Sequence, residues 1–281
     1  MKLPMQVDLK DKVAVVTGAG GVICSVMAEA LAASGAKVAL LDLKEEAAQK
    51  SADAIVANGY VAKGYKCNVL DKESIQAARD AIAADFGTCD ILVNGAGGNN
   101  PKATTDDEYF LPEDMGEMKT FFDLDPDGVS FVFSLNYMGT LLPTQIFAKD
   151  MVNKKGANII NIASMNAYTP LTKIPAYSGA KAAIVNFTEW LAVYFSKVGI
   201  RCNAIAPGFL ATAQNQKLLF NEDGTPTART GKILAGTPME RFGEPEELIG
   251  ALLFLASSEA SGFVSGACIP VDGAFAAYSG V

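Results

Sequence analysis

The chain has 281 residues, of which 50% are hydrophobic and 9% aromatic, so it can bury a sizeable core and lacks the composition of a disordered protein. Its formal net charge of −8 disfavours binding to nucleic acid or to an anionic membrane surface. The chain contains no histidine, which removes the commonest metal ligand and the usual general base. We therefore expect no metal and no nucleic-acid or membrane partner, and we expect acid–base chemistry on Tyr, Lys, Asp or Glu.

The five cysteines are odd in number, and no two lie close enough in sequence to suggest a metal clip. This pattern is typical of reduced, mostly buried thiols and indicates a cytoplasmic protein. The first twelve residues contain neither a long apolar run nor a cleavage signal. No segment reaches the roughly 20 apolar residues of a membrane-spanning helix.

Apolar, β-branched runs alternate with helical patterns along the chain. The expected strands lie at 12–17, 37–42, within 60–69, and at 89–97, 157–164, 200–208 and 267–273; the expected helices include 25–36, opened by Val22, as well as 45–58 and 71–87. Near-continuous apolar strands separated by helices predict an α/β fold with a doubly wound parallel sheet covered on both faces. No repeat or linker divides the chain, so we expect one domain over residues 1–281.

Ligands of such sheets bind outside the carboxyl ends of the strands. Six polar or turn-forming residues end the expected strands and should converge on one rim: Thr17, Asp42, Asn68, Asn94, Ser164 and Pro207.

The loop after the first strand resembles a dinucleotide-binding turn. Gly18 and Gly20 fit the pattern G-x-G-x-x-G, but Ile23 stands at the third glycine, and a plain glycine turn is the alternative. Asp42 ends the second strand, where a carboxylate can accept hydrogen bonds from an adenosine ribose. A cofactor 2′-phosphate there would meet like charge, at a cost of about 4 kcal/mol at 4 Å and an effective dielectric of 20. NAD is therefore favoured over NADP, although Lys44 lies close and a solvated Asp42 is the alternative.

Tyr177 and Lys181 are spaced i, i+4 and so share one face of an expected helix. A nearby ammonium would lower the pKa of a tyrosine, whose free value near 10 suits neither acid nor base at pH 7. Ser164 ends a strand thirteen residues earlier and could reach the same reacting oxygen. The spacing alone is common in amphipathic helices, but together with the glycine loop it indicates a catalytic site.

With these motifs, the chain resembles the short-chain dehydrogenase/reductase family over essentially its whole length. The family's T-G-x-x-x-G-x-G appears as TGAGGVIC at 17–24, with the middle glycine one place early and the last replaced by Cys24. Its N-N-A-G appears as NGAG at 94–97, with Gly95 in place of the second Asn. The family's helix Asn, its Ser–Tyr–Lys set and its P-G turn correspond to Asn136, Ser164, Tyr177, Lys181, Pro207 and Gly208.

This resemblance implies a Rossmann-type single domain that works as an NAD-dependent alcohol dehydrogenase or ketone reductase. It implies that Tyr177 exchanges a proton with the substrate oxygen, that Lys181 holds the ribose and lowers the tyrosine pKa, and that Ser164 orients the carbonyl or alkoxide. Asn136 would position a water that links Lys181 to bulk solvent. The implied cofactor-binding residues are Gly18, Gly20, Gly21, Val22, Ile23, Asp42, Leu43, Asn68, Val69, Asn94, Ala96, Gly97, Tyr177, Lys181, Pro207, Gly208, Phe209 and Thr212.

The segment 101–128 is longer than the family norm and should project over the rim, where loops set specificity. It contains two Lys and nine Asp or Glu, for a net charge of −7. A substrate lid and a solvated excursion or subunit contact remain open for this insert. Together with the stretch 164–181 and the loop from Gly208 to Arg241, it resembles the D-mannonate oxidoreductase, or fructuronate reductase, branch of the family.

This second resemblance implies a sugar acid as substrate. Its carboxylate would need a local cation, for which Lys102 and Lys173 are candidates, with Asn100 and Asn166 as neutral donors on the same two loops. Either lysine could instead pair with the insert's own carboxylates, in which case Arg229 or Arg241 could hold the substrate.

Two other functions remain open: a dehydrogenase of another polyol or sugar acid such as gluconate, and a non-catalytic NAD-binding sensor or scaffold. The intact Ser164, Tyr177 and Lys181 argue against the second. The resemblance to the family also suggests a homotetramer, packed partly through the long apolar helix after Tyr177.

Overall fold

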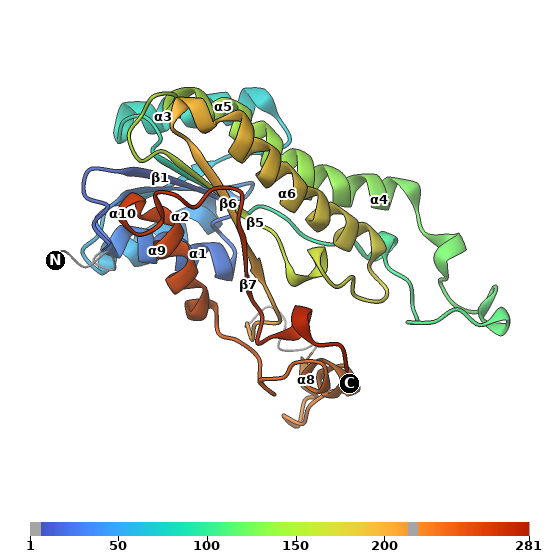
Figure 1. Cartoon of the computed structure of the whole chain (residues 1–281). Coiled ribbons are helices and arrows are strands. Elements are labelled where there is room, and N and C mark those ends of the chain that lie inside the picture. Colours follow the sequence, from blue (N-terminus) through green and yellow to red (C-terminus); the bar gives the residue numbers. More distant parts are fainter. Residues whose placement is uncertain (1–6, 213–218, 281) are drawn as a thin grey trace.

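The computed structural model describes residues 7–212 and 219–280, and it has a parallel seven-stranded sheet at its centre (Figure 1). The strand order is β3-β2-β1-β4-β5-β6-β7. The strands are β1 (Val13–Thr17), β2 (Lys37–Asp42), β3 (Ala62–Lys66), β4 (Ile91–Asn94), β5 (Asn158–Ile162), β6 (Arg201–Pro207) and β7 (Cys268–Val271). This architecture confirms the predicted doubly wound α/β fold.

Helices cover both faces of the sheet and bury two separate apolar clusters against it (Figure 1). On one face lie α1 (Val22–Ala33), α2 (Glu45–Ala57) and α9 (Ile249–Ala256), the last followed by the short α10 (Ser258–Ser261). On the other lie α3 (Lys72–Asp85), α5 (Gly139–Met151) and α6 (Pro175–Tyr194). The strands are apolar on both sides because both sides are covered.

The helix ends follow local sequence signals. Asp71 caps α3, because its side chain accepts hydrogen bonds from the N–H groups of Glu73 and Ser74. Helix α1 begins at Val22, as expected, and ends at Ala33, shortly before Gly35 takes a positive φ of 98°. No helix in the described part of the chain is long and apolar enough to cross a membrane.

The strand register brings the predicted rim residues together. Thr17 of β1 pairs with Asn94 of β4, and Asn94 pairs with Asn161 of β5. The Thr17 hydroxyl accepts hydrogen bonds from the N–H groups of Gly95 and Ala96, at 3.0 and 3.2 Å. The chain beyond β4 is therefore fixed against the end of β1, where the glycine loop begins.

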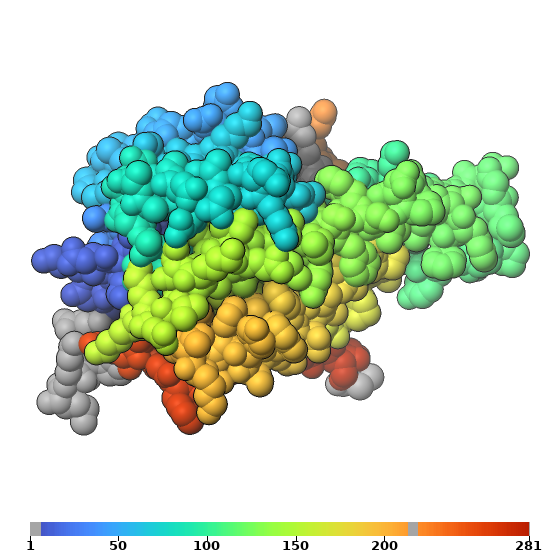
Figure 2. Space-filling view, turned by 90° about the horizontal axis from the view of Figure 1, so that it is seen from above, coloured from blue at the N-terminus to red at the C-terminus, as the bar shows by residue number. Residues whose placement is uncertain are grey.

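The insert extends away from the body as a lobe, seen in green at the right of Figure 2. It contains three short 3-10 helices, at Pro101–Ala103, Pro112–Asp114 and Phe121–Asp123, and leads into α4 (Pro126–Phe133). Helix α4 packs on α6 through Val132, Ala176 and Ala180. Several large apolar side chains of the lobe are exposed, including Tyr109, Phe121 and Phe122.

The loop from Gly208 to Arg241 is described except for residues 213–218, which lie outside the described residues. Its described part contains α8 (Ala228–Ala235), whose buried face holds Thr230 and Ile233.

Candidate active site

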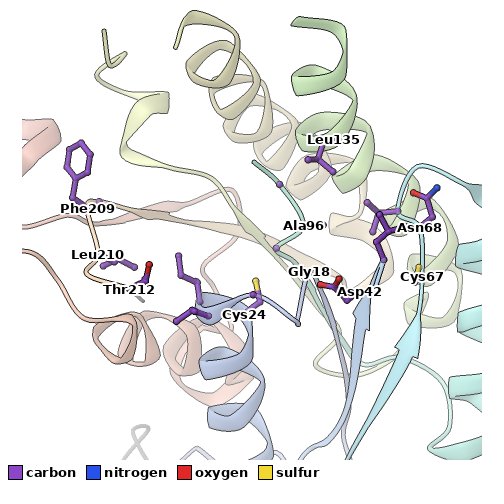
Figure 3. A pocket seen from close by; sticks show the side chains of 18 residues that line it. Gly18, Cys24, Asp42, Cys67, Asn68, Ala96, Leu135, Phe209, Leu210 and Thr212 are labelled. Atoms are coloured by element: carbon purple, nitrogen blue, oxygen red, sulfur yellow. The ribbon is translucent and has the colours of Figure 1, made fainter. Parts of the chain in front are cut away.

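A cleft of about 600 Å³ opens at the carboxyl ends of β1, β2, β4 and β6 (Figure 3). Its walls are formed by the glycine loop, by the ends of β2 and β4, by the chain after β3 and after β6, and by Leu135. The lining consists of Gly18, Gly21, Val22, Ile23, Cys24, Asp42, Leu43, Cys67, Asn68, Val69, Gly95, Ala96, Gly97, Leu135, Gly208, Phe209, Leu210 and Thr212.

The glycine loop leaves room and hydrogen-bond donors for an anion. Gly18 has a φ of 68°, and a Cβ on it would lie 2.9 Å from the Cα of Ala96. Gly21 caps α1 without any side-chain hydrogen bond, so the first-turn N–H groups have no side-chain partner there. Val22 and Ile23 of this turn line the cleft. A helix N-terminus whose first N–H groups have no side-chain partner suits a phosphate group.

Asp42 ends β2 and lines the cleft next to the glycine loop (Figure 3). One carboxylate oxygen accepts a hydrogen bond from the N–H of Gly20 at 3.1 Å, and the other accepts one from the N–H of Lys44 at 3.0 Å. Each oxygen keeps a further lone pair for a ligand hydroxyl. Within residues 7–212 and 219–280, the ammonium of Lys44 makes no ion pair with Asp42.

Ser164 and Tyr177 come together, and neither is among the residues that line this cleft. Ser164 follows β5 and Tyr177 lies in the first turn of α6. Burial raises the pKa of Tyr177, and a hydrogen bond with the Ser164 side chain opposes that rise. The two hydroxyls can therefore contact one substrate oxygen.

Lys181 lies one turn after Tyr177, and its Nζ is 5.6 Å from the centre of the tyrosine ring. The ammonium donates a hydrogen bond to the carbonyl of Ile162 at 2.8 Å. Burial lowers the pKa of Lys181 to about 8, partly opposed by the neighbouring Cys24. The i, i+4 spacing predicts this proximity of Lys181 to Tyr177. The expected lowering of the Tyr177 pKa is not seen, because burial raises it.

Asn136 sits in a π-helical turn, Ser134–Met138, between α4 and α5. Its side chain donates to the carbonyls of Gly98 and Val132, at 2.7 and 2.8 Å, and accepts from the N–H of Gly98 at 3.2 Å. A Cβ on Gly97 would lie 2.6 Å from Oδ1 of Asn136 and 3.2 Å from Nζ of Lys181. Asn136 and Lys181 therefore both approach the backbone at Gly97. The π-helical turn that holds Asn136 is a feature frequent at functional sites.

Most of the expected cofactor-binding residues line the cleft, but five do not: Gly20, Asn94, Tyr177, Lys181 and Pro207. Asn94 is buried within the sheet and donates to Thr144 and Asn161, both at 2.9 Å. Gly20 acts through its N–H bond to Asp42. Their place in cofactor binding remains a prediction.

The sequence argument missed five lining residues: Cys24, Cys67, Gly95, Leu135 and Leu210. Cys24 and Gly95 are two of the departures from the family motifs, and these departures were the available signal. Leu135 precedes Asn136 and Leu210 follows Phe209, so neighbours of expected residues also carried information. Burial raises the pKa of Cys24 to about 12, so its thiol is neutral.

The four expected substrate contacts divide between two locations. Asn166 is buried beside Ser164, and its N–H donates to the Ser164 hydroxyl at 3.3 Å. Asn100 caps the first 3-10 helix of the insert by accepting from the N–H of Lys102. Lys102 pairs with Asp125 at 3.2 Å, and Lys173 donates to the carbonyl of Asp106 at 2.7 Å. Lys102 thus pairs with a carboxylate of the insert, as the alternative interpretation expected, whereas Lys173 bonds a backbone carbonyl of the insert and no carboxylate. All four substrate contacts remain predictions.

Arg241 makes a two-pronged pair with Glu247, both bonds at 2.7 Å. Within residues 7–212 and 219–280, no three His, Cys, Asp or Glu side chains gather in a metal-binding arrangement.

Several known proteins that this chain resembles are described as reductases or oxidoreductases. A family profile described as enoyl-(acyl carrier protein) reductase matches residues 18–275. An uncharacterized oxidoreductase of Haemophilus influenzae is 63% identical over 281 residues, which are 100% of this chain and 99% of the relative. The uncharacterized oxidoreductase UxuB of Bacillus subtilis is 51% identical over 99% of this chain and 100% of its own length.

A solved crystal structure from Haemophilus influenzae, provisionally named a D-mannonate oxidoreductase, contains bound NAD. It is 63% identical to this chain, covers 100% of both chains and superposes with a TM-score of 0.96.

Proposed function

We propose that this chain, which belongs to the short-chain dehydrogenase/reductase family, is an NAD-dependent oxidoreductase that interconverts a sugar acid and its keto form, most specifically D-mannonate and D-fructuronate. One observation carries the proposal: Ser164, Tyr177 and Lys181 gather beside a cleft whose glycine loop and acidic rim fit a dinucleotide.

The fit to NAD rests on this chain's own residues. The uncapped first turn of α1 offers N–H groups to a pyrophosphate, and Asp42 offers carboxylate oxygens to the hydroxyls of an adenosine ribose. A 2′-phosphate at the same place would be repelled by Asp42. When bound, NAD supplies or accepts the hydride.

Acid–base catalysis falls to Tyr177. In the reducing direction its hydroxyl donates a proton to the substrate oxygen, and in the oxidising direction the tyrosinate removes that proton. The Ser164 hydroxyl donates a hydrogen bond to the same oxygen and stabilises negative charge there. The Lys181 ammonium, held by the carbonyl of Ile162, favours the tyrosinate by its charge. Asn136 fixes the backbone of Gly97 and Gly98 next to Lys181.

The substrate class is supported by a solved relative at 63% identity whose provisional name is D-mannonate oxidoreductase. Of the four residues expected to contact the substrate, Asn166 lies nearest to the chemistry, because its N–H bonds to the Ser164 hydroxyl. We propose Asn100, Lys102, Asn166 and Lys173 as residues whose substitution should alter the KM for a sugar acid.

We also propose that the protein acts in the cytoplasm as a homotetramer. Helix α6 buries one face against the sheet and exposes Trp190, Val193 and Tyr194 on another, with Trp190 and Tyr194 stacked at 4.6 Å between ring centres. An exposed apolar stripe of this kind is typical of a subunit contact.

The proposal is tested by measuring NADH oxidation over a panel of ketouronates, ketogluconates and neutral ketoses. Turnover that is fastest with D-fructuronate supports it, and a preference for a ketogluconate would select the gluconate alternative. Binding of NADH without turnover of any panel member would select the sensor or scaffold alternative.

A further inference from the structure

A short stretch of the insert, residues 105–108, is attached to the loop that joins Ser164 to Tyr177. The N–H of Thr105 donates to the carbonyl of Lys173 at 2.9 Å. In return, the ammonium of Lys173 donates to the carbonyl of Asp106 at 2.7 Å. Lys173 lies four residues before Tyr177, so this two-way contact fixes the insert next to the catalytic loop.

The backbone at Lys173 supports this contact at a conformational cost. Lys173 has a φ of 73°, in the left-handed region that residues other than glycine seldom adopt. Such a conformation persists where the surrounding structure determines it. Here it directs the carbonyl of Lys173 to the N–H of Thr105, while the side chain reaches Asp106.

The same stretch is attached on its other side to α8. The ammonium of Lys232 pairs with a carboxylate oxygen of Glu108 at 2.8 Å, and this contact raises the pKa of Lys232. The Glu108 side chain is 24% exposed, whereas that of Lys232 is 68% exposed. Helix α8 belongs to the chain segment that follows the cleft-lining residues Gly208, Phe209 and Leu210.

Two segments that are far apart in the sequence therefore hold one stretch of four insert residues. One segment leads into Tyr177, and the other leads away from the cofactor cleft. Figure 1 shows the insert, the loop before α6 and α8 around the same end of the molecule.

We propose that residues 105–108 form one wall of the substrate mouth, meaning the opening beside Ser164 and Tyr177, and that Lys173 and Lys232 are positioning residues that hold this wall in place. This inference rests on the proposed function, because it assigns a boundary to that same site. In this role each ammonium group acts through the insert and does not need to bind a substrate carboxylate. The wall then selects substrates by size, not by charge.

The first test uses Glu108→Gln, Lys232→Gln and Lys173→Gly. The glycine variant removes the Lys173 side chain and tolerates the positive φ, so the backbone contact to Thr105 can remain. Glu113→Gln is the matched control, because Glu113 is an exposed carboxylate of the same insert and forms no ion pair within the described residues.

We expect each of the three variants to raise the KM roughly two- to fivefold, the range of an exposed ion pair or a single hydrogen bond, with kcat and NAD affinity little changed. The factor should be equal for a sugar acid and for a neutral ketose of the same length. The charge exchange Glu108→Lys with Lys232→Glu should return the KM to that of the parent, and Glu113→Gln should leave it unchanged. An increase confined to the sugar acid would mean that the lysine binds the carboxylate and would overturn the wall.

A second readout does not depend on turnover. Amide hydrogen exchange at residues 105–110 should become faster in Lys232→Gln and Lys173→Gly and stay at the parent rate in Glu113→Gln. Unchanged exchange in the first two variants would also overturn the inference. If the parent turns over no sugar acid at all, the proposed function fails, and the exchange experiment still decides whether the insert is held.

Discussion

The side chain of Cys24 occupies the space that a side chain at position 95 would need, and Gly95 leaves that space free. A Cβ added at position 95 would lie 2.2 Å from Sγ of Cys24 and 3.0 Å from the carbonyl oxygen of Thr17. Cys24 and Gly95 are both positions at which the chain departs from the family motifs, with a cysteine for the last glycine and a glycine for the second asparagine. The cysteine side chain fills the room that the missing side chain at position 95 leaves. The two departures therefore complement one another in space.

This pairing predicts the behaviour of a double-mutant cycle. Gly95→Asn alone should lower the free energy of unfolding by about 1–3 kcal/mol, because overpacking forces neighbouring groups to move. Adding Cys24→Gly should recover most of that loss, with a coupling free energy above about 0.5 kcal/mol. Thermal unfolding of the parent, the two single variants and the double variant measures this coupling free energy. Additive effects of the two substitutions would refute the pairing.

The carboxyl ends of the strands were predictable from the sequence because each strand is a short apolar run that stops at a polar or turn residue. Thr17, Asp42 and Ser164 all took their expected places on the rim for this reason. The i, i+4 spacing of Tyr177 and Lys181 likewise depends only on helix geometry.

Contacts made across the fold were not predictable in this way. The side-chain partners of Asn94 are one example, because the register of β4 with β5 directs its amide to Asn161 inside the sheet, and its part in cofactor binding stays a prediction. The partners of Lys102 and Lys173 depend on how the insert folds back on the protein. The sequence of the insert has no helical or strand periodicity from which that path could be predicted. The coupling of Cys24 with Gly95 was invisible for the same reason, since 71 residues separate them.

Tyr177 should be indispensable for turnover. Tyr177→Phe removes only the hydroxyl, so the fold and the NAD affinity should match those of the parent. The turnover number should fall at least a hundredfold, because positioned acid–base catalysis is worth about 10²- to 10⁴-fold. Steady-state kinetics with NADH titration measures both quantities, and residual activity above a hundredth of the parent's would exclude Tyr177 from this role.

Lys181 should destabilise the folded protein at neutral pH. Burial lowers its pKa from 10.5 to about 8. Between these two pH values the unfolded chain binds more protons than the folded protein, so the free energy of unfolding rises with pH. Relative to Lys181→Met, the parent should gain about 2–3 kcal/mol of unfolding free energy between pH 7 and pH 10. Urea unfolding at several pH values measures the difference, and a constant difference would show that the lysine pKa is unshifted.

Asp42 should control the choice of cofactor. Asp42→Ala removes the charge that repels a 2′-phosphate and also the oxygens that accept from Gly20 and Lys44. The ratio of kcat/KM for NADH to kcat/KM for NADPH should therefore fall, because NADH binds more weakly and NADPH binds more tightly. A parent that already prefers NADPH would contradict this role of Asp42.

The most direct measurement is the initial rate of NADH oxidation by the parent with D-fructuronate, run beside the same assay with Tyr177→Phe and with NADPH as the cofactor. We expect the parent to oxidise NADH with this substrate, the variant to be at least a hundredfold slower, and NADPH to support a much lower rate. Equal rates for the parent and Tyr177→Phe, or no oxidation of NADH with any sugar acid, would contradict an NAD-dependent sugar-acid oxidoreductase built on Tyr177.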